Sequence, residues 1–169
     1  MSWPLRPLLP LAAAGAAAFA APAHAVTQTA NVKVSVVKPL TLTALQDMDL
    51  GTITLNGGTW ASTTVGISRT GVATCGSNVI CSGAPQVARF KVTGTNKMVV
   101  LVSAPPVTLT NQSDPTKTLT MTVDSPGTVT LTSSGQPGTD FDVGGSIALS
   151  STTADGTYSG TINITVDYQ

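Results

Sequence analysis

The chain has 169 residues, and its eight Lys and Arg are balanced by eight Asp, with no Glu and one His. This balance offers no basic patch for nucleic acid. His and Glu are the commonest general acid–base groups, and metal sites favour clusters of Cys and His. The composition therefore argues against a nucleic-acid-binding protein and against an enzyme.

Residues 1–25 have the order of parts found in a secretory signal peptide. Arg6 supplies a positive charge, residues 8–21 are uncharged and mostly Leu and Ala, and Ala23-His24-Ala25 places small residues where a signal peptidase cleaves. A bilayer span needs about 20 apolar residues, and this run is shorter. We therefore predict a signal peptide over residues 1–25, which takes the single His with it, and one domain over residues 26–169 without a membrane span. The protein would cross the periplasm and end at the cell surface or outside the cell.

Alternating apolar and polar residues predict a strand at the start of this domain. One face of residues 26–36 is formed by Val26, Ala30, Val32, Val34 and Val36. Such alternation is typical of a strand with one buried and one solvated face. Pro39 interrupts the pattern, and Leu40 and Leu42 resume it. Two interpretations stay open: a first strand of the chain's own sandwich, or a strand donated to another subunit.

Seven further runs are predicted as strands: residues 50–55, 65–70, 87–93, 98–103, 118–124, 127–132 and 141–149. Clusters of Gly, Pro, Asn, Asp and Ser separate them. Threonine, which is β-branched and suits a pleated surface, occurs 28 times in the chain. Together these features predict an all-β domain, an antiparallel β-sandwich or barrel. Gly144-Gly145, inside the last of these runs, predicts a bulge.

Cys75 and Cys81 are separated by five residues. In an exported protein, two thiols this close are expected to form a disulfide. The alternative is a redox or metal-binding pair, but a metal site would need more Cys or His nearby. The closed loop is short, so the disulfide is expected to stabilise the fold by about 2–2.5 kcal/mol.

Two pairs of carboxylates and one tryptophan are the candidates for chemistry or ligand binding. Asp47 with Asp49, and Asp140 with Asp142, could hold Ca²⁺ or act as paired carboxylates, but calcium usually needs more oxygen ligands. Trp60 follows a Gly-rich turn and could stack on a sugar or cover the edge of a core. We expect solvated strand ends and a packed Trp60, with no catalytic residue, metal or cofactor.

The last strand is predicted over residues 157–169. Tyr158, Ile162, Ile164, Val166 and Tyr168 share one face, and mostly Thr, Ser and Asn occupy the other. Its apolar row is expected to face the core, with Tyr168 closing it.

Four stretches together resemble a bacterial family called domain of unknown function 4402. They are Leu50-Gly51-Thr52-Ile53, residues 88–94 (ARFKVTG), residues 141–149 (FDVGGSIAL) and residues 156–168 (GTYSGTINITVDY), and they extend over nearly all of the predicted domain. The family usually has Phe-Gly where this chain has Leu50-Gly51.

The end of the chain is also similar to pilin subunits of the chaperone–usher route and to spore-coat U-type proteins, which end in an alternating strand with a penultimate Tyr, here Tyr168. This resemblance implies an incomplete immunoglobulin-like sandwich completed by a strand from outside. It implies a periplasmic chaperone that reads Ile162, Ile164, Val166 and Tyr168, an usher, and copies of the subunit or its relatives as partners. The donated strand would carry Ala30, Val32, Val34 and Val36.

The function expected from these features is that of a structural subunit of a fimbria-like surface assembly. The alternative is a monomeric secreted or periplasmic module that binds carbohydrate or protein, with Trp60 and the Asp pairs as its contacts. The two are distinguished by whether the exported protein assembles.

Overall fold

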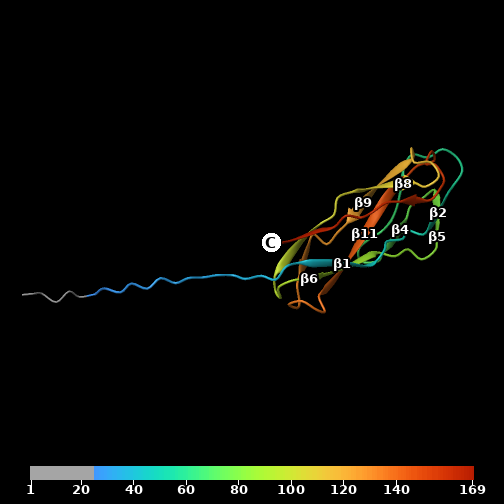
Figure 1. Ribbon diagram of the computed structural model, residues 1–169. Helices are drawn as coiled ribbons and strands as arrows, with labels where there is room; N and C mark the ends of the chain where they lie inside the picture. The colour runs from blue at the N-terminus through green and yellow to red at the C-terminus, as the bar shows by residue number, and fades with distance from the viewer. Residues whose placement is uncertain (1–24) are drawn as a thin grey trace, which may run out of the picture. The chain divides into compact units, whose positions relative to one another are not determined.

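The computed structural model describes residues 25–169, and every regular element in that range is a β-strand. None of the described residues forms a helix that could cross a membrane. The strands, shown in Figure 1, are β1 (Thr41–Gln46), β2 (Thr52–Leu55), β3 (Thr63–Ile67), β4 (Ala73–Cys75), β5 (Val79–Ser82), β6 (Ala88–Thr93), β7 (Val99–Ser103), β8 (Val107–Asn111), β9 (Thr118–Asp124), β10 (Thr128–Thr130), β11 (Thr139–Leu149), β12 (Tyr158–Ser159) and β13 (Thr165–Tyr168).

The chain divides into two units, Met1–Val34 and Ser35–Gln169, and all of these strands lie in the second. Residues 25–40 belong to no strand. The interpretation of residues 26–36 as the first strand of the chain's own sandwich is therefore wrong. The first strand is β1. The predicted signal peptide lies outside the described residues, apart from Ala25, and stays a prediction.

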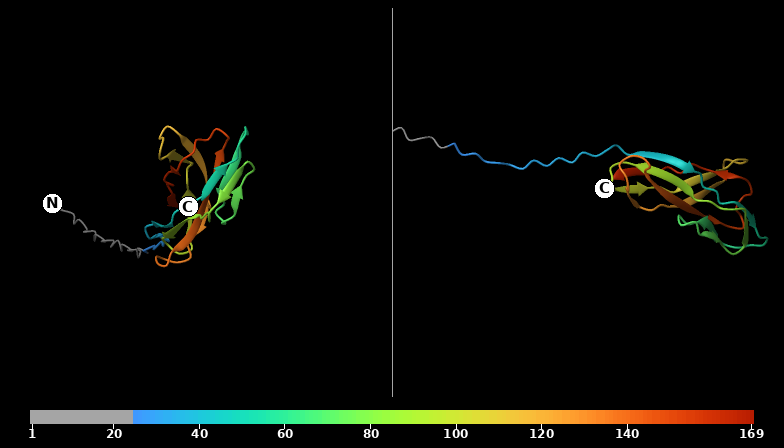
Figure 2. Two further views of the ribbon diagram at one scale, coloured as in Figure 1. Left: turned by 90° about the vertical axis from the view of Figure 1, so that its right-hand side faces the viewer. Right: turned by 90° about the horizontal axis from the view of Figure 1, so that it is seen from below.

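The strands form three sheets, and every strand pair is antiparallel. The largest sheet has the order β1-β6-β11-β9-β8-β12, with β3 paired to β11 and β4 paired to β3. A second sheet has the order β10-β7-β13, and β2 pairs with β5 in a third. Figure 2 shows the sheets layered against one another in two further views. The prediction of an all-β, antiparallel sandwich is confirmed.

The long strand β11 connects two hydrophobic cores because it changes partners halfway along. Its first half pairs with β6 up to Val143, and its second half pairs with β9 and β3 from Gly144 and Gly145 onward. Alternate side chains point inward over the whole length, Phe141 and Val143 into the first core and Ile147 and Leu149 into the second. Because the alternation is unbroken, the predicted bulge at Gly144-Gly145 is wrong.

The two glycines are explained by close backbone approach instead. A Cβ at Gly144 would collide with the carbonyl oxygen of Ile67, and one at Gly145 would lie 2.9 Å from the sulfur of Met121. At Gly144 only a residue without a side chain lets the backbone at the end of β3 come this near, whereas the neighbours of Gly145 are the flexible side chains of Met121 and Met48. The structure has a register shift elsewhere, in β1 between Ala44 and Gln46.

The first core lies between the β6–β11 half of the large sheet and the β10-β7-β13 sheet. Its most buried members are Val92, Val100, Val143 and Leu131, which are at most 1% exposed. The second core lies between the β3–β11–β9–β8 region and the β2–β5 sheet, and its buried residues are Val65, Val79, Val107, Met121, Ile147 and Leu149. The fold is thus a β-sandwich with two connected cores.

Candidate functional site

The C-terminal segment is one extended strand with an interrupted ladder. Its first part, β12, pairs with β8, with Tyr158 opposite Asn111. Its last part, β13, pairs with β7, with Thr165 opposite Ser103. If the register of β12 with β8 continued along the segment, Thr165 would lie opposite Ala104 and not Ser103. The registers of the two parts therefore differ by one residue. The segment therefore runs antiparallel to β8 and then β7 as one continuous partner.

The interruption has a local cause on the opposite side. Ala104-Pro105-Pro106 separates β7 from β8, and proline has no backbone N–H to donate to a ladder. As a result, residues 160–164 make no main-chain hydrogen bond to any part of the chain that the structure describes. On its other side the segment has no strand partner among the described residues, because β12 and β13 each end their sheet, and an open strand edge is a template for another strand.

The predicted alternation of the C-terminal strand is confirmed. Ile162, Ile164, Val166 and Tyr168 are half-buried and pack against the first core. Ile162 also touches the second core. Asn163, Thr165 and Asp167 are exposed. The row is covered on the core side only, and no side chain in it is fully buried.

A second half-covered edge belongs to β1. This strand pairs only with β6, and Leu42, with Leu40 just before it, packs half-buried on the first core. Both edges converge at Gly94, where a Cβ would lie 2.5 Å from the hydroxyl of Tyr168 and 2.8 Å from Cδ2 of Leu40. We call the half-buried side chains of the two edges the apolar strip: Leu40, Leu42, Ile162, Ile164, Val166 and Tyr168.

Tyr168 ties the end of the chain to the start of β1. Its hydroxyl donates a hydrogen bond of 2.6 Å to the carbonyl oxygen of Lys38 and accepts one of 2.8 Å from the backbone N–H of Thr95. The backbone N–H of Lys38 donates to Oγ1 of Thr95 at 2.7 Å. The backbone N–H and the carbonyl oxygen of Lys38 are therefore both hydrogen-bonded. The role of Lys38 was not foreseen from the sequence, since no pattern around it signals an anchor.

The alternating residues before this anchor are exposed. Val26 is 79% exposed, Val32 is 91%, and Val34 and Val36 are both 84%; Ala30 is also exposed. These valines keep the periodicity of a strand, but their segment belongs to no strand among the described residues.

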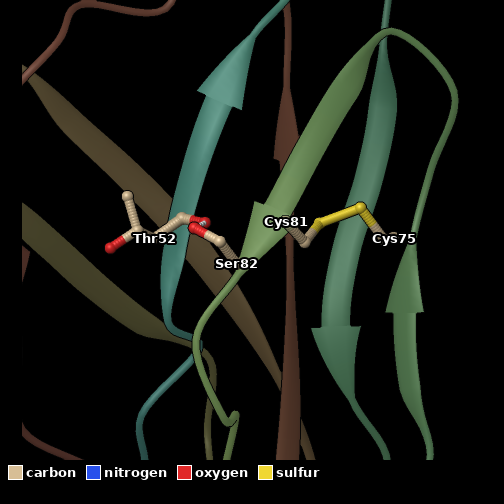
Figure 3. The surroundings of a disulfide bond; sticks show 4 residues. All are labelled: Thr52, Cys75, Cys81 and Ser82. Atoms are coloured by element: carbon tan, nitrogen blue, oxygen red, sulfur yellow. Dashed lines mark hydrogen bonds between the residues drawn. A yellow bond between two sulfur atoms is a disulfide. The ribbon is translucent and has the colours of Figure 1, made fainter.

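The disulfide predicted between Cys75 and Cys81 is present, with an S–S distance of 1.99 Å. Figure 3 shows it joining β4 to β5. Since β4 belongs to the large sheet and β5 pairs with β2, the bond links two sheets. Ser82, next to Cys81, donates from its hydroxyl to the carbonyl oxygen of Thr52 at 3.3 Å and adds to the β2–β5 pairing.

Trp60 is packed rather than presented to solvent. Its ring lies half-buried against the second core, and its Nε1 donates to the carbonyl oxygen of Asn56 at 3.1 Å. Its backbone carbonyl accepts a hydrogen bond from the hydroxyl of Ser151 at 3.1 Å. The ring therefore covers the edge of a core, as expected.

The four aspartates do not converge on one another. Asp49 accepts a hydrogen bond from the backbone N–H of Gly51 at 2.8 Å, and Gln86 donates to the carbonyl oxygen of Asp47. Asp140 and Asp142 face Lys91 and Arg89 across the β6–β11 ladder. Among residues 25–169, no three His, Cys, Asp or Glu side chains gather where they could hold a metal ion.

An open pocket of about 360 Å³ lies beside these ion pairs, lined by Arg69, Thr70, Arg89, Pro126, Asp140, Phe141 and Asp142. Both arginines are already bonded, Arg89 to Asp142 at 2.7 Å and Arg69 to Asp124 at 2.8 Å. The hydrogen bond and charge of Asp142 raise the pKa of Arg89, which stays protonated. Exposed pairs of this kind contribute little stability, and the pocket offers no uncompensated charge to a ligand.

Comparison with known protein families gives a match. A family model described as "Domain of unknown function (DUF4402)" matches residues 40–168. No curated protein and no solved structure matches the chain. The matched range begins at Leu40 and ends at Tyr168, so it spans both edges of the apolar strip.

Proposed function

The chain belongs to the family called domain of unknown function 4402, and from the geometry of its apolar strip we propose that it is a structural subunit of an exported, fimbria-like surface assembly. Subunits are joined by β-strand addition. The observation that carries the proposal is the coexistence in one chain of an unpaired, half-covered strand edge and an exposed row of valines with strand periodicity.

Strand addition would resolve both features at once. An added strand forms main-chain hydrogen bonds with the open edge, and its alternate side chains set the register. Valines that are 84–91% exposed in the single chain would leave water as they meet the strip. Burying such a side chain contributes about 1.5–3 kcal/mol, so three or four of them, together with the new main-chain hydrogen bonds, offset the entropy cost of ordering the segment.

The same strip is the surface that a periplasmic chaperone would cover before assembly. Exposed strand edges with apolar rows aggregate when they are left open. A chaperone that lends a strand to Ile162, Ile164, Val166 and Tyr168 would keep the subunit soluble until an usher or a neighbouring subunit replaces it. The proposed location, periplasm in transit and then the cell surface, agrees with the signal-like residues 1–25 and with the disulfide, since disulfides persist in oxidising compartments.

A non-catalytic role agrees with the composition, because residues 25–169 contain neither His nor Glu. The rival proposal, a monomeric carbohydrate-binding module, draws no support from its candidate contacts. Trp60 covers a core, Asp142 and Asp140 pair with Arg89 and Lys91, and the carboxylate of Asp49 accepts a hydrogen bond from the backbone N–H of Gly51.

The test is the size distribution of the exported protein, measured by light scattering after size separation, with and without a co-expressed periplasmic chaperone of the chaperone–usher type. The proposal expects multimers that form on export and a one-to-one complex while chaperone is in excess. A protein that stays monomeric in both preparations at high concentration would rule the proposal out.

A further inference from the structure

We propose that Asn56 is a site of spontaneous chemical modification in the folded protein. Its side-chain amide is converted to a carboxylate after attack by the backbone nitrogen of Gly57, which follows it in the loop after β2. The inference goes beyond the proposed function and does not depend on it, because it concerns the chemistry of the chain and not its assembly.

The sequence of the loop supplies the reacting pair. Asn56 is the only asparagine among residues 25–169 that precedes a glycine. The other asparagines in this range precede Val, Lys, Gln or Ile, whose side chains crowd the backbone nitrogen that would have to attack. Glycine has no Cβ, so the approach of the Gly57 nitrogen to the side chain of Asn56 is unobstructed.

The fold leaves both reacting groups free. Asn56 is exposed, and its side-chain amide forms no hydrogen bond with any part of the chain that the structure describes. The backbone N–H of Gly57 likewise has no acceptor there, and a Cβ at Gly57 would meet no atom within 4 Å. The attack therefore requires no hydrogen bond of these two groups to be broken and no neighbour to move.

Asn111 shows the opposite arrangement in the same protein. It is only 1% exposed. Its Nδ2 donates to the carbonyl oxygen of Asp155 at 2.8 Å, and its Oδ1 accepts from the backbone N–H groups of Ser113 and Asp114. Every polar atom of this amide is therefore engaged, and the fold protects it from reaction.

Turn geometry does not account for the Asn-Gly pair. Asn-Gly is typical of two-residue β-hairpin turns, in which both residues have positive φ. Here β2 pairs with β5 and not with β3, the next strand along the chain. Neither Asn56 nor Gly57 has a positive φ. The backbone therefore does not need these two residues for the reason that usually selects them.

Trp60 makes the nitrogen of Gly57 easier to deprotonate. Its Nε1 donates to the carbonyl oxygen of Asn56 at 3.1 Å. This oxygen belongs to the same peptide group as the nitrogen of Gly57, and hydrogen bonds polarise the groups that they join. Electron density drawn toward the carbonyl oxygen weakens the N–H bond of Gly57, and the deprotonated nitrogen is the form that attacks.

The reaction is balanced without any cofactor. The nitrogen of Gly57 forms a bond to Cγ of Asn56, and its proton leaves with the side-chain NH2 as ammonia. Water then opens the cyclic imide. Cleavage of the bond to Cγ gives aspartate. Cleavage of the bond to the main-chain carbonyl carbon gives isoaspartate, in which that carbonyl, the acceptor of the Trp60 bond, becomes a free carboxylate. Both products add a negative charge to the loop that carries Trp60 over the second core.

The experiment follows the exported chain during incubation at mildly alkaline pH, below its melting temperature, and in parallel in urea. Peptide mapping by mass spectrometry measures the conversion of each asparagine, and an isoaspartate-specific methyltransferase labels the isoaspartate product. Gly57→Ala is the matched variant, since its Cβ has room in the fold but crowds the attacking nitrogen. Asn111 is the internal control.

We expect Asn56 to convert in the folded protein at a rate within a few-fold of the rate in urea, with isoaspartate formed, while Asn111 stays an amide. Gly57→Ala should slow the conversion of Asn56 several-fold. A folded-state rate for Asn56 that is orders of magnitude below the rate in urea would overturn the inference, because the fold would then protect the site. Equal rates for Gly57→Ala and the unmodified chain would also overturn it, since the nitrogen of Gly57 would not be the attacking group.

Discussion

The hydroxyl of Tyr168 donates a hydrogen bond of 2.6 Å to the carbonyl oxygen of Lys38, 130 residues earlier in the chain. The same hydroxyl accepts a bond from the backbone N–H of Thr95. One side chain at the end of the last strand therefore joins three segments: the entry to β1, the turn after β6, and β13. The contact also holds the backbone of Lys38, three residues before β1.

Tyr168→Phe is expected to lower the free energy of unfolding by about 1–3 kcal/mol, because a partly buried hydroxyl with two hydrogen bonds is lost while the ring stays in place. Tyr158→Phe is the matched control, since its hydroxyl makes one bond, to the carbonyl oxygen of Ala154 at 2.9 Å. Its effect should be smaller. Urea unfolding of the purified variants measures both, and an equal loss for the two would contradict the anchoring role of Tyr168.

Replacing both Cys75 and Cys81 with Ser is expected to lower the free energy of unfolding by about 2–2.5 kcal/mol, as the chain-entropy estimate for a short loop gives. Since the bond links β4 to β5, the loss should be accompanied by faster amide hydrogen exchange in the β2–β5 sheet than in β6 or β11. Uniform exchange throughout the domain would show that the bond does not hold these two sheets together.

Gly144→Ala is expected to lower the free energy of unfolding by about 1–3 kcal/mol or more, because the new Cβ would collide with the backbone of Ile67 and Arg69 in a packed interior. Gly57→Ala is the control, since a Cβ there meets nothing within 4 Å. Thermal melting distinguishes the two. A Gly144→Ala protein as stable as the control would mean that β3 can move away from β11 at little cost.

Asp114 provides a test by pH. The hydroxyl and the backbone N–H of Thr116 both donate to its carboxylate and lower its pKa. Because the pKa of Asp114 is lower in the folded protein than in the unfolded chain, its ionised carboxylate stabilises the native state at pH values above the unfolded pKa. This contribution is lost as the pH falls through the folded pKa. Thr116→Val removes the hydroxyl bond, so the pKa of Asp114 should rise while staying below its usual range. An NMR titration measures it, and an unchanged pKa would contradict this cause.

Alternation along the chain predicted the strands that bury one complete face. Thr118–Asp124 appears as predicted, and β6, β7 and β11 differ by one or two residues at their ends. The short strands β4 and β5 were missed because three or four residues carry too little periodicity. Strand β8 was missed although Val107 and Leu109 alternate with Thr, because it follows directly on the turn signal Pro105-Pro106.

The candidate site was only partly predictable for a different reason. The apolar row from Ile162 to Tyr168 could be read from local alternation. The gap in its hydrogen bonding could not, because it depends on Pro105 and Pro106, which lie more than fifty residues earlier and face the strand only after folding. The anchoring of Lys38 depends in the same way on Thr95 and Tyr168.

The central claim, assembly through the exposed valine row, is tested most directly by two double variants with the same change in charge. Val32→Asp with Val34→Asp places two charges on the apolar face of the donor, and Asn31→Asp with Ser35→Asp places two on its polar face. All four positions are exposed, so neither variant should alter the melting temperature of the single subunit.

The measurement is the molar mass of each exported protein by light scattering at matched concentrations. We expect the Val32/Val34 variant to remain monomeric, because a charge cannot be buried against the apolar strip without a large desolvation cost, while the Asn31/Ser35 variant assembles like the unmodified protein. Equal assembly of the two variants, or equal loss of assembly, would contradict donation of this strand.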